Sequence, residues 1–138
     1  MPLTLEIVTP ERKVLSETVE HVVLPSEHAG EIDILPGHIP LMTMMEPGEL
    51  RYFKDGKPES IAVDKGFIRV YGDTVSVLTE AAIEVDKIDV KSLEEAQARA
   101  ASAVAEAKLS DVDPAILEEL ETRARFAVIQ KIISDKKR

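Results

Sequence analysis

The clearest candidates for chemistry in this sequence are three histidines and two adjacent pairs of carboxylates. Histidine is the commonest metal ligand and proton carrier, but His21, His28 and His38 lack the spacing of a metal-binding motif. We interpret them as surface or satisfied core residues. Glu94-Glu95 and Glu118-Glu119 are sequence neighbours in expected helices. Adjacent residues on a helix point in different directions, so these carboxylates do not converge on a substrate.

Motifs that mark common active sites are absent. The sequence contains no G-x-S-x-G, G-x-x-x-x-G-K-[ST], G-x-G-x-x-G or H-E-x-x-H. It also has no cysteine, which excludes disulfides, thiolate nucleophiles and cysteine-ligated metals and is consistent with a reducing compartment. We therefore expect a protein that is not an enzyme and that has no metal site and no cofactor.

Charge and hydropathy narrow the range of partners. The 138 residues carry a formal charge of −9, and such a field repels nucleic-acid phosphates and anionic lipid head groups. No apolar run approaches the roughly 20 residues that span a bilayer. Residues 1–6 lack the basic and apolar regions of a signal peptide. We expect a cytosolic chain that binds neither nucleic acid nor the membrane surface directly.

Composition divides the chain into two parts. All six glycines and seven of the eight prolines lie in residues 1–86, whereas residues 87–138 contain ten alanines, no glycine and one proline, Pro114. The net charge of −9 belongs wholly to the first part. This change predicts a β domain over 1–86 and a helical domain over 87–138.

The first part alternates apolar and polar residues in short runs separated by turn residues. One side of the first run carries Leu3, Leu5 and Ile7, and one side of the next clear run carries Val19, His21 and Val23. Asp55-Gly56 predicts a type I′ hairpin turn, and Gly72-Asp73 predicts a second turn. Eight to ten such strands, with no room for helical crossovers, indicate an antiparallel sandwich or flattened barrel.

From Asp89 the period becomes helical. Either Asp89 or a capping box starting at Ser92 begins the first helix. Its apolar stripe is mainly alanine: Leu93, Ala96, Ala100, Ala103 and Ala107. Alanine burial contributes little at ~25 cal/mol per Å². We therefore expect weak packing between this helix and its neighbour.

A second helix begins at Pro114 after the cap residue Asp113. One stripe of this helix comprises Leu117, Leu120, Ala124 and Val128, and a second stripe comprises Phe126, Ile129 and Ile133. Two stripes are more than one neighbouring helix covers. The hairpin either packs against the sandwich of the same chain or can detach from it and bind another protein.

Residues 34–45 stand out because twelve successive residues carry no charge in a chain that is 31% charged. Pro36-Gly37 and Pro40 impose turns, and a methionine-rich strand follows. This loop is either a corner packed on the sandwich core or a surface for protein contact, since methionine adapts to irregular partners.

At residues 30–41, GEIDILPGHIPL, the sequence resembles the signature of the epsilon subunit of bacterial F-type ATP synthase. The likeness continues through residues 47–50, 54–56, 66–70 and 75–78. It implies a β + α fold, with an N-terminal ten-stranded antiparallel β-sandwich followed by a C-terminal antiparallel two-helix hairpin. It also implies a non-catalytic rotor subunit that joins gamma to the ring of c subunits, on the cytoplasmic side of the bacterial cell membrane.

The resemblance also implies roles for single residues. The loop from Glu31 to Leu41 would face the c ring, opposite the Asp55-Gly56 hairpin. Glu31 and His38 would make the polar contacts, with Met42 and Met44 as apolar support. The alternative is that Glu31 is an ordinary solvated turn residue.

The C-terminal helices can, in this family, extend along gamma into the alpha/beta hexamer and inhibit ATP hydrolysis. Phe126, Ile129 and Ile133 would make these contacts. Members that bind ATP tend to show [Ile or Leu]-Asp-x-x-Arg-Ala, whereas residues 88–93 here read IDVKSL. Arg123, on the second helix, matches a basic position seen in members that bind ATP, but the position one turn further on is Ala127. Asp89 and Arg123 are therefore the remaining nucleotide-binding candidates. We expect weak ATP binding or none, with Asp89 serving as a helix cap.

Asp33 is a further departure, because glycine is common at its position in the family. It would alter the loop geometry or occupy an exposed turn. Three classes of function stay open at this point: a rotor subunit and inhibitor, a nucleotide-sensing module, and a small β-sandwich ligand-binding protein or enzyme. The first accounts for both parts of the chain.

Overall fold

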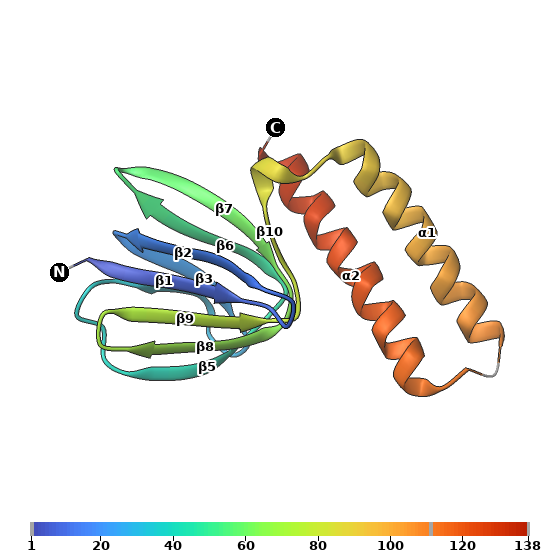
Figure 1. The fold of residues 1–138 in the computed structure, drawn as a ribbon, viewed down its shortest axis with the longest axis horizontal. Helices are drawn as coiled ribbons and strands as arrows, with labels where there is room; N and C mark the ends of the chain where they lie inside the picture. Colours follow the sequence, from blue (N-terminus) through green and yellow to red (C-terminus); the bar gives the residue numbers. More distant parts are fainter. Residues whose placement is uncertain (1, 111, 138) are drawn as a thin grey trace. The chain divides into compact units, whose positions relative to one another are not determined.

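The computed structural model describes residues 2–110 and 112–137, and the chain forms two compact units, Met1–Asp86 and Lys87–Arg138 (Figure 1). The first unit contains ten strands and the second contains two helices. The strands are β1 (Leu3–Val8), β2 (Lys13–Val19), β3 (His21–Ser26), β4 (Gly30–Ile34), β5 (Leu41–Met45), β6 (Gly48–Lys54), β7 (Lys57–Val63), β8 (Gly66–Tyr71), β9 (Thr74–Thr79) and β10 (Ala82–Glu84). A short 3₁₀ turn (Val85–Lys87) precedes α1 (Val90–Leu109) and α2 (Pro114–Lys137). The expected β + α architecture is confirmed.

The strands form one curved sheet in the order β10-β7-β6-β3-β5-β8-β9-β1-β2, and β4 pairs with β3 outside this path. Among the described residues, the strand pairs are antiparallel with one exception. β1 pairs with β9 in parallel, with Thr4 opposite Thr74 and Val8 opposite Leu78. The expectation of a wholly antiparallel sandwich is therefore wrong at this pair. Parallel neighbours need a crossover helix only when they follow each other in the chain, and β1 and β9 do not.

The core is made by the inward-facing, alternate residues of the strands. Leu3, Leu5 and Ile7 are fully buried, as the period of two predicts. In β3, however, Val22 and Leu24 are buried, whereas His21 and Val23 are half-buried on the other side. The sequence-based assignment of His21 and Val23 to one side with Val19 does not describe the core of β3. Val19 ends β2 and Glu20 separates the two strands, so the alternation of β2 does not continue into β3.

The predicted hairpin turn between β6 and β7 is confirmed. Asp55 and Gly56 have positive φ values of 53° and 74°, which the type I′ turn requires at both positions. The Glu20 carboxylate accepts a hydrogen bond from the Gly56 N–H at 2.7 Å. The second predicted turn, Gly72-Asp73, joins β8 to β9.

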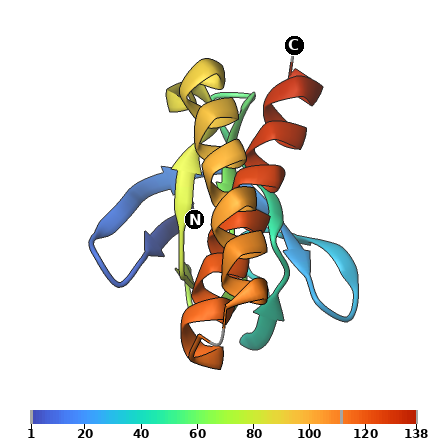
Figure 2. The same cartoon turned by 90° about the vertical axis from the view of Figure 1, so that its right-hand side faces the viewer.

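The helices of the second unit run antiparallel and pack on each other (Figures 1 and 2). Leu93 and Ala107 are buried, and the alanines between them on the stripe are half-buried. This confirms the predicted alanine stripe of α1. In α2, Ala127 is buried and Val128 is 41% exposed, so the predicted stripe is wrong at its last position. Steps of three and four residues from Leu117 reach Ala127.

Aspartates cap both helices. Asp89 accepts hydrogen bonds from the N–H groups of Lys91 and Ser92 at 3.1 and 3.4 Å. Ser92 also donates its hydroxyl to Asp89 at 3.0 Å, so the alternative capping box that starts at Ser92 is wrong. At the second helix, Asp113 accepts the Ala115 N–H at 2.9 Å. Both caps satisfy amides that the first turn of a helix leaves without partners.

Candidate functional site

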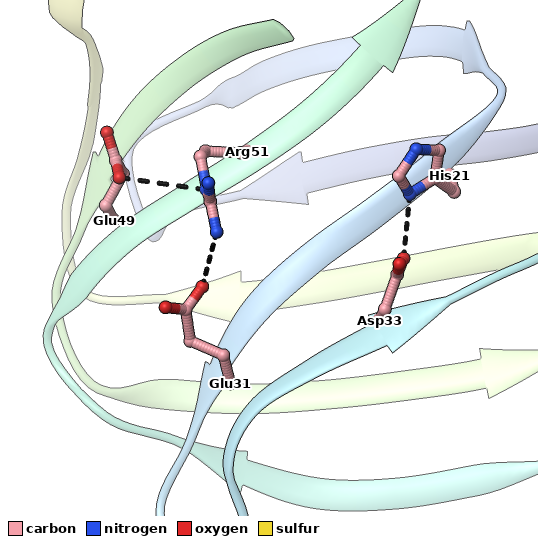
Figure 3. A network of polar contacts seen from close by, with 5 residues as sticks. All are labelled: His21, Glu31, Asp33, Glu49 and Arg51. Atoms are coloured by element: carbon pink, nitrogen blue, oxygen red, sulfur yellow. Dashed lines mark hydrogen bonds and ion pairs between the residues drawn. The ribbon is translucent and has the colours of Figure 1, made fainter.

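The outward surface of β6, β3 and β4 carries a set of polar side chains, which we call the polar face: His21, Glu31, Asp33, Glu49 and Arg51 (Figure 3). Arg51 Nη2 lies 2.6 Å from Glu31 Oε2, and Arg51 Nε lies 3.8 Å from Glu49 Oε1. Glu31 is therefore paired within the chain. It lies in strand β4, since the loop that follows begins only at Leu35, so the expectation that Glu31 belongs to that loop is wrong.

Asp33 contacts the first histidine of the chain. His21 Nδ1 lies 2.8 Å from Asp33 Oδ1, and the His21 ring stacks on Phe53 with a centroid separation of 4.1 Å. The aspartate at the glycine-rich family position therefore lies in a strand, not in an exposed turn. It provides a cross-strand polar contact between β4 and β3.

A second outward surface, on β5, β8 and β9, is mainly apolar, and we call it the apolar face. Its exposed large side chains are Met42, Met44, Phe67, Tyr71 and Leu78. Met44 is opposite Phe67, and Phe67 is opposite Leu78, so these three side chains form a continuous row across the sheet. Phe67 is 52% exposed and Leu78 is 50% exposed. Sheet faces with this much exposed apolar surface are typical of protein interaction sites.

An apolar groove of about 470 Å³ adjoins this row. Its lining includes Val8, Pro10 and the row residues Met44, Phe67 and Leu78, with Lys65 and Glu80 among its charged residues. The groove therefore extends the apolar face toward the ends of β1 and β9.

The loop of residues 35–40 follows the polar face in sequence. Leu35 and Ile39 are 54% and 75% exposed. The His38 N–H donates to the Leu35 carbonyl at 3.1 Å, and His38 Nδ1 lies 2.7 Å from the Ile39 carbonyl. The loop is thus tied by local hydrogen bonds and presents apolar side chains to solvent.

The four residues expected at the c ring therefore occupy three places. Glu31 lies on the polar face, His38 lies in the loop, and Met42 and Met44 lie on the apolar face. A pocket of about 430 Å³ is lined by Pro36 together with Lys54 and Asp55. The loop and the Asp55-Gly56 hairpin are thus at the same end of the sandwich, and the expectation that they lie at opposite ends is wrong.

The nucleotide candidates on the hairpin are occupied by other contacts. Asp89 serves as the cap of α1, and the hydrogen bond from the Ser92 N–H, followed by that from the Ser92 hydroxyl, lowers the pKa of its carboxyl. Arg123 lies 2.8 Å from Glu119 one turn earlier on α2.

The expected regulatory residues of α2 differ in exposure. Ile133 is buried, and Phe126 and Ile129 are half-buried. The apolar side chains that α2 exposes most are Ile116, Val128 and Ile132, at 51%, 41% and 57%. Val128 and Ile132 are one turn apart on the same face.

Two absences concern the described part of the chain. Residues 2–110 and 112–137 contain no cluster of three or more histidine, aspartate or glutamate side chains that could hold a metal ion. Among the same residues, neither helix combines the length and hydrophobicity that crossing a bilayer requires.

The sequence did not indicate the roles of Arg51, Glu49 and Leu78. A period of two over residues 66–71 puts Phe67 and Tyr71 on one side of a strand, but alternation cannot tell an outer side from an inner one. The charged Arg69 between them was the available signal that this side faces water.

Comparisons with known proteins identify the family. Residues 2–85 match the family model described as the β-sandwich domain of the ATP synthase delta/epsilon chain. The ATP synthase epsilon chain of Herpetosiphon aurantiacus is 44% identical over 104 residues, covering 75% of this chain and 76% of the relative. That of Carboxydothermus hydrogenoformans is 48% identical over 98 residues, covering 71% and 72%.

Solved structures show the same fold. A chain in the mitochondrial ATP synthase of Euglena gracilis, in an assembly of OSCP, F1 and c ring, is similar with a TM-score of 0.66 and 20% identity, covering 97% of this chain and 81% of that one. A chain in the central stalk and c ring of the Tetrahymena thermophila enzyme gives a TM-score of 0.60 at 10% identity, covering 97% of both chains. The matched family model and the bacterial relatives show that this chain belongs to the epsilon-chain family of ATP synthases.

Proposed function

We propose that this chain is a non-catalytic rotor subunit that joins the gamma subunit to the c ring and whose helical hairpin inhibits ATP hydrolysis. The observation that carries this proposal is the exposed apolar face of β5, β8 and β9 in a chain of the epsilon family. A stable partner would cover this face, and we assign it to gamma. The solved structures with the same fold come from assemblies that contain the c ring, which supports the second contact.

The c ring would meet the sandwich through Glu31 and the loop that holds His38. The exposed Leu35 and Ile39 would add apolar contact there. Met42 and Met44, which the family resemblance assigned to the c ring, fit the gamma contact better because they lie on the apolar face. Attachment to the membrane would then be indirect, through the complex on the cytoplasmic side of the bacterial cell membrane.

The hairpin would be the regulatory element. Its helices share an interface made largely of alanine, so the compact packing contributes little free energy. A second arrangement that differs by only a few kcal/mol could then be populated. Val128 and Ile132 are already exposed for contact with the alpha/beta hexamer, and Phe126, Ile129 and Ile133 would join them when the hairpin changes its packing.

No observation favours a nucleotide-sensing role. Ser92 and Ala127 cannot supply the guanidinium groups that hold phosphate bidentately, and Asp89 and Arg123 are engaged as described. The chain would therefore need no cofactor.

The test is to delete residues 88–138 in the ATP synthase of the same organism. The truncated chain is expected to copurify with gamma and to support ATP-driven proton pumping, while ATP hydrolysis by the complex rises severalfold. Loss of copurification with gamma would refute the assignment of attachment to the sandwich. Unchanged hydrolysis would refute inhibition by the hairpin.

A further inference from the structure

Arg51, on β6, contacts Glu31, the residue proposed to meet the c ring. Arg51 is paired with Val23 at one edge of β3, and Glu31 is paired with Pro25 at the other edge of the same strand. The Arg51 side chain therefore crosses the outer surface of β3 to reach the Glu31 carboxylate at 2.6 Å (Figure 3). This contact ties β4 to β6, which are not neighbours in the sheet.

Arg51 is held more firmly than the residue that it contacts. Its side chain is 37% exposed, against 60% for Glu31, and Glu49 on its other side is only 20% exposed. The Nε atom of Arg51 is buried without a hydrogen-bond partner and lies 3.8 Å from Glu49 Oε1, at ion-pair distance. An arginine fixed in this way restricts the rotamers of an exposed glutamate. The contact thus favours one orientation of Glu31 on the surface.

The pairing also changes the charge that Glu31 presents. A bare carboxylate attracts cations over about a Debye length, ~10 Å at 0.1 M salt. The guanidinium at 2.6 Å compensates much of this attraction. Oε2 is the oxygen that contacts Arg51, so Oε1 remains as the acceptor that a partner can reach. What Glu31 offers is a directed hydrogen-bond acceptor rather than an isolated charge.

We propose that Arg51 is a positioning residue for docking of the c ring: it orients Glu31 to accept a hydrogen bond from the polar loop of subunit c and makes that contact insensitive to salt. This proposal rests on the function proposed above, in which Glu31 meets the c ring.

The test uses disulfide crosslinking in assembled membranes. Because the chain has no cysteine, Ala29→Cys introduces a single one, in the exposed turn between β3 and β4. This turn projects from the sandwich (Figure 2, pale blue). A second cysteine is placed in the polar loop of c, and crosslink yield is measured between 50 and 500 mM salt.

With Arg51 in place, the yield is expected to vary less than twofold over this salt range. Arg51→Ala is expected to lower the yield at least threefold at 500 mM salt, with partial recovery at 50 mM as the uncompensated Glu31 charge attracts the loop. Glu31→Gln leaves a single acceptor oxygen, and because Arg51 contacts that oxygen, the amide N–H₂ replaces the acceptor that faces the polar loop, so the yield is expected to fall at both salt concentrations. Lys13→Ala, which removes another cross-strand ion pair, from β2 to Glu6 on β1 at 3.8 Å, is the matched control and is expected to change nothing.

The outcomes separate the two proposals. If Glu31→Ala abolishes the crosslink but Arg51→Ala leaves its yield and salt dependence unchanged, the role of Arg51 is refuted and the c-ring contact stands. If the chain with unaltered Glu31 and Arg51 gives no crosslink, the c-ring contact itself is refuted. Thermal unfolding of each full-length variant identifies loss of fold. If Arg51→Ala unfolds the chain, Arg51→Lys is measured instead, and an unchanged salt dependence in that variant also refutes the proposal.

Discussion

Replacing Phe67 by alanine tests whether the apolar face binds gamma. Phe67 occupies the middle of the row formed with Met44 and Leu78, so a partner that covers the face must contact it. Its side chain points away from the core, on the opposite side of β8 from the buried Ile68 and Val70. The substitution should therefore weaken binding without unfolding the sandwich.

The expected loss follows from the exposed area. A phenylalanine side chain offers roughly 200 Å², and 52% of Phe67 is exposed, so a partner could cover about 100 Å². At about 25 cal/mol per Å² this contact is worth ~2.5 kcal/mol. Alanine keeps a small part of it, which leaves a loss of about 2 kcal/mol, or about a 25-fold increase in Kd.

The assay is titration of purified gamma with the full-length chain by calorimetry or surface plasmon resonance. Leu35→Ala is the matched control, because Leu35 is an apolar side chain of the same unit with a similar exposure of 54% and lies outside the apolar face, in the loop assigned to the c ring. Thermal unfolding of both variants should match that of the parent chain. An unchanged Kd for Phe67→Ala, in a variant that remains folded, would refute the assignment of gamma to this face.

Three further predictions concern the fold and the hairpin. Gly66→Ala should destabilise the sandwich by about 1–3 kcal/mol in chemical denaturation, because its Cβ would lie 2.0 Å from the Leu78 carbonyl oxygen; Gly48→Ala, whose nearest neighbour would be Pro25 Cβ at 3.4 Å, should change stability little. The pKa of Asp89 is lowered in the folded hairpin by hydrogen bonds from Ser92. The ionised cap therefore stabilises the folded hairpin at pH values above the unfolded pKa of about 3.9. This stabilisation is lost as the pH falls through the lower pKa of the folded state. The difference in thermal stability between the parent chain and Asp89→Asn, which caps without titrating, should therefore shrink below about pH 4, and a constant difference would contradict the argument. Calorimetric titration with ATP should show no micromolar binding, and such binding abolished by Arg123→Ala would overturn this expectation.

Local patterns in the sequence predicted the inward residues well where one strand could be read alone. The buried Leu3, Leu5 and Ile7 follow from a period of two. The error in β3 arose where the chain passes from β2 to β3 through Glu20 and the alternation restarts. Val128 was misplaced because helical stripes advance by steps of three and four, and the sequence alone does not say which step a neighbour selects.

The candidate site was harder to predict because it depends on which strands are neighbours. Glu31 and Arg51 are far apart in sequence, and their contact exists because β4 and β6 both pair with β3. The same holds for the row of Met44, Phe67 and Leu78, which comes from three strands. The family resemblance supplied Glu31 and His38 as candidates. It did not indicate that Arg51 pairs with Glu31, or that Met42 and Met44 lie on a different face of the sandwich from Glu31.

The parallel pair of β1 and β9 constrains how the sandwich can fold during synthesis. β1 and β2 can form a hairpin as soon as they leave the ribosome, but the other edge of β1 has no partner until β9 is made. Contacts between distant parts of a sequence close slowly because the loop entropy must be overcome first. An exposed strand edge during this interval invites pairing with other chains. Folding of the sandwich therefore depends on how soon Thr74–Thr79 is synthesised. Slow translation before β9 should favour aggregation more than slow translation within the helices that follow.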